Sequence, residues 1–247
     1  MLGAVELLRK SEGHVFKNPD GVESTFKLLP PLTDEELRNL QAQIPCRIPE
    51  EMCEIFRCAR GFEGVWLETI DFSGLTFSFG MGFGMEKLFP HPVHIAGDGL
   101  GNFWTVDLTS GSEKWGPIFY ACHDAPVVIL QSRCVSDFIV EVLKELEAPW
   151  KSEIDDVMER HARTIWRDNP GVISYDQCVA SGDADLREFA ASLDSSWEFV
   201  DLRSCVVGEG FSWGRYGPKT VSKRFGEKRI FACQQRSLGR RILDAFR

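Results

Sequence analysis

The chain has 247 residues, of which 43% are hydrophobic, and its 28 lysines and arginines against 37 aspartates and glutamates give a net charge of −9. This composition argues against a disordered, collagen-like or coiled-coil chain and fits one large domain or two small ones. The charge is divided unevenly, because residues 213–247 carry ten basic and two acidic side chains. The tail is therefore at +8 and residues 1–212 are at −17, so a cationic partner is the natural electrostatic complement of the body.

The two ends and the cysteines indicate a cytoplasmic protein. Glu6 precedes any apolar run, so the N-terminus lacks the pattern of a signal peptide. The apolar stretch 72–85 is too short and too rich in glycine to cross a bilayer, and we expect no membrane association. Eight cysteines without a Cys-x-x-Cys spacing do not form the pattern of a disulfide scaffold in a chain of this length.

The N-terminal third is predicted to be mainly helical. Residues 1–27 read as an N-terminal extension, with a short helix and an Asn-Pro-Asp-Gly turn. Thr33 and Glu36 have the spacing of a capping box at the start of a helix. A second helix begins near Pro49 and is expected to end at Gly61, a residue that suits a left-handed C-cap. The two helices form a predicted hairpin.

The middle of the chain is predicted to be extended. Bulky and small residues alternate over residues 75–85, which indicates a strand with one buried face. Further strands are predicted at 93–96, 103–108, 118–120 and 127–130. The glycine-rich sequence Gly97–Asn102 is typical of a turn between the first two of these. An amphipathic helix follows over residues 135–146, and Ala148-Pro149-Trp150 marks a domain boundary.

The last hundred residues mix helices and strands. Helices are predicted at 152–168, 183–193 and 238–246, and strands at 197–202, 211–216, 220–225 and 229–234. Because helices and strands occur in blocks rather than in alternation, the fold class is α+β. We expect a domain over residues 28–148 and a C-terminal α+β extension over 149–247, which either packs on the same core or forms a separate lobe.

The residues do not favour a site for a metal ion, a phosphate group or a hard cation. His91, His94 and His123, with Cys122, are ligand types that transition metals prefer. A proline between the first two histidines and the extended context misalign their side chains, so we expect no metal ion. The glycine-rich turn leads into a strand rather than a helix and lacks the anion site of a phosphate loop, and the calcium-loop pattern is absent. We therefore expect no cofactor.

Enzymatic and nucleic-acid functions receive little support from the residues. Neither a Gly-x-Ser-x-Gly elbow nor a cysteine-protease context occurs, and an active site assembled from distant residues stays open as an alternative. In the tail, aromatic and basic residues alternate, as in proteins that bind single-stranded nucleic acids. The same pattern describes a half-buried strand. We expect the basic tail to dock on the acidic body and not to bind nucleic acid.

The middle of the chain resembles the SUKH superfamily, which includes fungal cell-wall assembly regulators and many bacterial immunity proteins. The resemblance covers about residues 28–147. It rests on the helical hairpin 32–56 closing in Arg60-Gly61, the glycine-rich turn and strand 95–108, and Gly116-Pro-Ile118 with the helix through Asp137-Phe138.

This resemblance implies a mainly antiparallel sheet with helices packed against it, and a non-enzymatic protein. Bacterial members commonly bind and neutralise a cognate toxin, often a nuclease, and we expect such a cationic toxin as the partner. Asp98, Asp107 and Glu113, near the glycine-rich turn, are the expected contact residues. The alternatives are a regulatory or scaffold module of the cell-wall-regulator kind, and a metal-binding protein or uncharacterised enzyme.

Overall fold

The computed structural model of the protein describes residues 3–18, 20–67, 69–76, 88–217 and 220–235. The helices are α1 Ala4–Ser11, α2 Asp34–Gln43, α3 Glu50–Cys58, α4 Val135–Glu145, α5 Glu153–Asp156, α6 Ala162–Asp168, α7 Tyr175–Val179 and α8 Ala184–Ala191, with a π-helical turn Val157–His161 between α5 and α6. The strands are β1 Val15–Lys17, β2 Glu23–Thr25, β3 Lys27–Leu28, β4 Gly61–Glu63, β5 Ile70–Asp71, β6 Pro92–Gly97, β7 Phe103–Asp107, β8 Ile118–Cys122, β9 Val127–Ser132, β10 Ile173–Ser174, β11 Glu198–Asp201, β12 Gly210–Phe211, β13 Thr220–Arg224 and β14 Ile230–Gln235. All strand pairs among the described residues are antiparallel, and the predicted α+β class is confirmed.

A central sheet with the strand order β12-β9-β8-β7-β6 is covered on both faces. Every residue of β8 and β9 is buried, which is the pattern of strands with no solvent-exposed side. Ile118 and Tyr120 of β8 belong to a core that includes α4, α5 and α6. Phe119 and Ala121, on the opposite face, belong to a second core. Successive side chains of one strand therefore enter two different cores.

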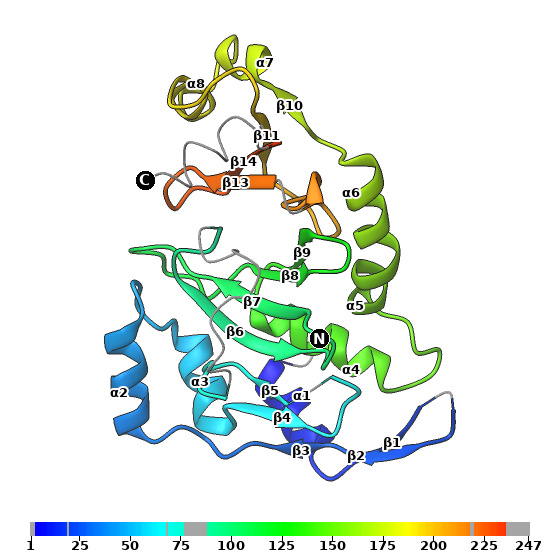
Figure 1. The fold of residues 1–247 in the computed structure, drawn as a ribbon. Coiled ribbons are helices and arrows are strands. Elements are labelled where there is room, and N and C mark those ends of the chain that lie inside the picture. The colour runs from blue at the N-terminus through cyan, green and yellow to red at the C-terminus, as the bar shows by residue number, and fades with distance from the viewer. Residues whose placement is uncertain (1–2, 19, 68, 77–87, 218–219, 236–247) are drawn as a thin grey trace, which may run out of the picture.

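The C-terminal segment supplies the layer that covers the second face. Its sheet has the order β10-β11-β14-β13, and Val200 and Phe231 join the core beneath the central sheet. On the other side of this sheet, Phe199 and Ile230 pack with Phe189 of α8. The result is a stack of helices, central sheet, C-terminal sheet and helices α7 and α8 (Figure 1). The segment after residue 149 also adds β12 to the edge of the central sheet.

The N-terminal residues pack at the far end of the stack. Strands β1 and β2 form a hairpin, and β3, β4 and β5 form a small sheet (Figure 1). Helix α1 packs against α3 and α4. Leu8 of α1 and Phe26 before β3 are fully buried in the main core, so residues 1–27 contribute to the core that the rest of the domain shares.

Several predicted elements are confirmed, and one helix end is corrected. The capping box of Thr33 and Glu36 is formed at the start of α2, and strands β6–β9 and helix α4 lie where predicted. Helix α3, however, ends at Cys58, with an extended Ala59 as its C-cap. Gly61 instead begins β4, where a Cβ atom would lie 1.9 Å from the carbonyl oxygen of Ile70. A close approach of two strands, rather than a left-handed cap, requires this glycine.

Other differences lie in the C-terminal half. The helix predicted over 152–168 is present but contains the π-helical turn, and the strand predicted over 211–216 is reduced to β12. Helix α7 was not predicted. Of the alternating stretch 75–85, residues 75 and 76 are in a turn and the rest lie outside the described residues, as does the helix predicted over 238–246.

Candidate functional site

The three acidic residues expected to contact a partner are not brought together. Asp98 precedes β7, and its carboxylate accepts hydrogen bonds from the backbone N–H groups of Leu100 (2.8 Å) and Asn102 (3.1 Å). Asp98 therefore holds the glycine-rich turn in shape, which confirms the turn itself. Glu113 is exposed in the loop after β7. Asp107 lies at the opposite end of β7 from Asp98.

The expected exposure of Asp107 is wrong, because its side chain is completely buried. Arg224 of β13 donates to both carboxylate oxygens (2.7 and 3.0 Å), and Arg229 donates to one of them (2.7 Å). The C-terminal sheet covers this end of β7, which the local sequence does not reveal. The prediction that the basic tail docks on the acidic body is confirmed by these two arginines.

The loop between β13 and β14 completes this contact. The carboxylate of Glu227 accepts from the backbone N–H and the hydroxyl of Ser110, both at 2.6 Å, and lies 3.3 Å from His91 Nε2. The hydrogen bonds from Ser110 are the main cause that lowers the pKa of Glu227. We call the buried pair Asp107 and Arg224, together with Ser110, Glu227 and Arg229 at its rim, the buried junction, because these residues join the central sheet to the C-terminal segment.

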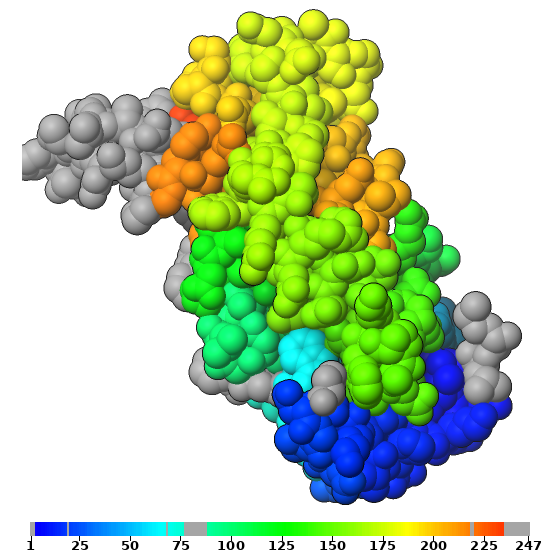
Figure 2. Space-filling view, turned by 90° about the vertical axis from the view of Figure 1, so that its right-hand side faces the viewer, coloured from blue at the N-terminus to red at the C-terminus, as the bar shows by residue number. Residues whose placement is uncertain are grey.

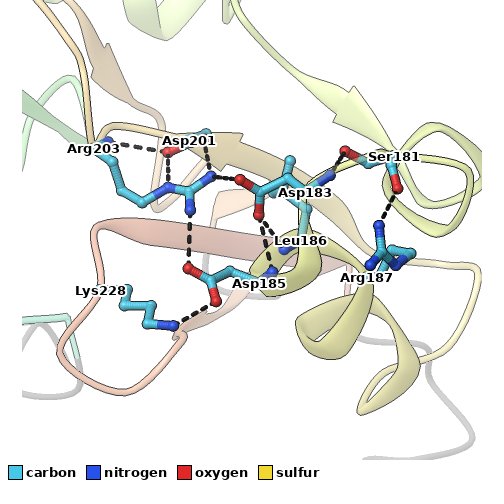
Figure 3. A network of polar contacts seen from close by, with 8 residues as sticks. All are labelled: Ser181, Asp183, Asp185, Leu186, Arg187, Asp201, Arg203 and Lys228. Carbon is cyan, nitrogen blue, oxygen red and sulfur yellow. Dashed lines mark hydrogen bonds and ion pairs between the residues drawn. The ribbon is translucent and has the colours of Figure 1, made fainter.

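A second charged network lies wholly within the C-terminal segment (Figure 3). The guanidinium of Arg203 donates to Asp183, Asp185 and Asp201 at 2.6–2.9 Å. Asp185 also contacts Lys228, in the loop after β13. The hydrogen bonds that Arg203 donates to Asp201 and then to Asp183 raise the pKa of Arg203 further. Each carboxylate here already has a cation of its own chain, so the network ties α8 to β11 and to the β13–β14 loop.

The three histidines weighed as metal ligands are separated. His91 lies beside Glu227, His94 packs edge-on against Phe103, and His123 contacts Asn102 and Asp124. Within the part of the chain that the structure describes, no group of three or more His, Cys, Asp or Glu side chains has a metal-binding arrangement. The same described part contains no helix long and apolar enough to cross a membrane.

An exposed site is formed instead where the β4–β5 connection meets the end of α4. Trp66 is 48% exposed, and its indole Nε1–H donates to Glu145 Oε2 at 2.6 Å. Its ring edge meets the buried ring of Trp104, with centroids 6.4 Å apart. A large aromatic side chain is therefore held at the surface in one orientation. We call Trp66, Glu145, Trp150 and Asp155 the acidic–aromatic patch.

The hairpin of β1 and β2 is hydrogen-bonded to both segments that carry the tryptophans of this patch. Trp150, in the turn after α4, donates its indole N–H to the carbonyl of Lys17 in β1 (3.2 Å). Strand β1 pairs with β2, and the Ser24 hydroxyl of β2 donates to the carbonyl of Gly64 (2.8 Å), two residues before Trp66. Figure 2 shows this face, where a small cyan area of the β4–β5 region lies between the blue N-terminal residues and the green α4 region.

Trp150 has an unusual backbone conformation. Its φ is 54°, in the left-handed region that bulky side chains rarely adopt. The side chain is 38% exposed, so burial of the indole is incomplete. A glycine would satisfy this backbone position with less strain, and strained positions of this kind cluster at functional sites.

The electrostatics of the patch are those of carboxylates without a counter-ion. Burial raises the pKa of Glu145 to about 7, against the hydrogen bonds from Trp66, Ser152 and the Asp155 backbone. Burial and the charges of Glu159 and Asp156 raise the pKa of Asp155. Among the described residues, neither Glu145 nor Asp155 forms an ion pair. The neighbouring Lys144 is paired with Glu141.

No motif marks this patch, since its residues come from three separate segments. The nearest indication in the sequence is Trp150, in the Ala-Pro-Trp turn that predicts a domain boundary. Comparisons of the chain with protein-family models, with curated proteins and with solved structures found no match.

Proposed function

We propose that this protein is a non-enzymatic binding module of the immunity type, which binds and neutralises a cationic toxin protein of the nuclease type. The resemblance of residues 28–147 to the SUKH superfamily suggests this class. The acidic–aromatic patch supports it with a surface suited to protein recognition.

The observation that carries the proposal is the fixed, half-exposed Trp66 beside an unpaired carboxylate. Tryptophan is enriched among the residues that contribute most to protein–protein binding, above all where it is held rigid. Here the hydrogen bond to Glu145 and the contact with Trp104 fix the ring before any partner arrives. Acidic groups at its rim favour a basic partner, speed the encounter and disfavour acidic competitors.

The distribution of cations within the chain reinforces this choice of partner. Arg224 and Arg229 are engaged with Asp107, and Lys228 with Asp185. These tail cations therefore neutralise carboxylates of the junction and of the C-terminal segment. Among the residues that the structure describes, no cation pairs with Glu145 or Asp155.

Co-expression with the product of the adjacent reading frame tests the proposed function. If that product is a toxin, we expect this protein to restore growth and to co-purify with it. A genomic neighbourhood without a toxin-like frame, together with no rescue of growth, would contradict the proposal. Stable association with several host proteins in a strain lacking any toxin would favour the regulatory or scaffold alternative.

A further inference from the structure

We propose that the acidic–aromatic patch seats an arginine side chain of the basic partner, with the guanidinium against the Trp66 indole and paired with Glu145 and Asp155. This inference rests on the proposed function and names the chemical group that the surface recognises. When the guanidinium binds, the patch releases a proton.

Glu145 has no cationic partner among the described residues. Glu145 is partly buried, and its carboxylate accepts from the Trp66 indole, the Ser152 hydroxyl and the Asp155 backbone. All of these donors are neutral. Carboxylates removed from water are ordinarily paired with a cation, because burial of an unpaired charge is costly. The buried junction shows how the same chain treats Asp107, which has two arginines.

The Trp66 indole provides an aromatic surface beside the Glu145 carboxylate. Trp66 is half exposed and its indole N–H is bonded to the Glu145 carboxylate, so a cation that pairs with this carboxylate comes to lie beside the indole. A cation beside an indole gains attraction from the ring, and the planar guanidinium of arginine combines stacking with paired hydrogen bonds to carboxylates. The more strongly hydrated ammonium of lysine does this less well.

Binding of a guanidinium depends on the protonation state of Glu145. Because burial raises the pKa of Glu145 to about 7, this group is partly protonated near neutral pH. A guanidinium stabilises only the ionised form, so seating it releases a proton and affinity increases with pH. The charge of Asp155 on α5 disfavours ionisation of Glu145, and Lys144, the neighbouring cation on α4, is paired with Glu141.

The experiment uses the full-length protein and a blocked Gly-Arg-Gly peptide as the probe. The matched probe is the same peptide with citrulline, which keeps the shape of arginine and lacks its charge. The readout is the NMR signal of the Trp66 indole N–H, assigned by its loss in Trp66→Phe. We expect a saturable shift with the arginine peptide at pH 8, about 30-fold weaker binding at pH 5.5, and no saturation with citrulline.

Glu145→Gln is the decisive variant, because glutamine retains an oxygen for the Trp66 indole but cannot ionise. We expect it to lose most of the affinity and the pH dependence, while Glu188→Gln, at an exposed acid of α8, binds as the wild type does. Equal shifts with citrulline, no saturable shift at pH 8, or unchanged binding by Glu145→Gln would each overturn the inference.

The two proposals fail in different ways. Growth rescue by the wild type, without any response of Trp66 to the arginine peptide, would remove this inference and leave the proposed function. A response to the peptide in a protein that rescues no neighbouring toxin would leave the arginine site and remove the proposed function.

Discussion

The buried junction and the acidic–aromatic patch differ in whether their carboxylates have a cationic partner among the described residues of the chain. In the junction, Asp107 is fully buried and receives hydrogen bonds from Arg224 and Arg229. In the patch, Glu145 is partly buried, and its hydrogen-bond donors among the described residues are all neutral. The comparison shows that the charge count of a sequence does not tell which acids are available to a partner, because the fold itself neutralises some of them.

The structure also shows where the basic tail contacts the acidic body. The tail does pair with the body, as its charge predicted, but it does so through a buried contact at one end of β7. The acids that stay open lie elsewhere, at the end of α4. The three predictions that follow test each side of this difference, from the largest expected effect to the smallest.

Replacement of Asp107 by Asn tests the junction. The change leaves Arg224, whose side chain is 1% exposed, without a counter-charge. Removal of one member of a buried ion pair costs about 3–5 kcal/mol, and we expect the free energy of unfolding, measured by urea denaturation, to fall by that amount. The exposed Glu113→Gln serves as control and should stay within about 0.5 kcal/mol of the wild type. A loss below about 1 kcal/mol in Asp107→Asn would mean that the junction contributes little to stability.

Replacement of Glu145 by Gln tests the patch by the pH dependence of stability. The pKa of Glu145 is about 7 in the folded protein and lower in the unfolded chain, so the folded state binds the proton more tightly. The stability that protonation provides is complete at acidic pH and is lost as the pH rises to about 7. We expect Glu145→Gln to exceed the wild type by about 1–2 kcal/mol at pH 8, after allowance for partial solvent exposure, and to match it near pH 4.5. Parallel pH profiles of the two proteins would show that Glu145 has an ordinary pKa.

Replacement of Trp150 by Gly and by Ala separates strain from side-chain contacts. Both variants lack the indole, but only alanine must adopt the left-handed backbone with a Cβ atom. We expect the glycine variant to be more stable than the alanine variant by about 1 kcal/mol in thermal unfolding, with equal loss of partner binding. Equal stability of the two variants would indicate that the backbone relaxes around residue 150.

Local patterns predicted much of the fold. The capping box of α2, the apolar face of α4 and the strands flanking Gly97–Asn102 depend on neighbouring residues, and each is present. The docking of the C-terminal sheet depends on residues such as Phe119 and Phe231, which are far apart in the chain. No local pattern contains that information. For the same reason the sequence placed Asp107 at the surface.

The candidate site was less predictable than the fold. Trp66, Glu145 and Asp155 meet because the β4–β5 connection lies across the end of α4, and neither segment carries a motif. The acids beside the glycine-rich turn attracted attention because they are close in sequence. In the structure Asp98 stabilises its own turn and Asp107 is internal.

The most direct test is growth rescue against the product of the adjacent reading frame by Trp66→Ala and by Glu188→Gln, at an exposed acid of α8, with folding checked by thermal unfolding. We expect Glu188→Gln to protect as the wild type does. We expect Trp66→Ala to fold but to bind at least about 30-fold more weakly and to fail to protect, as for removal of a central tryptophan. Full protection by a folded Trp66→Ala, or loss of protection in Glu188→Gln alone, would contradict the proposed role of the acidic–aromatic patch.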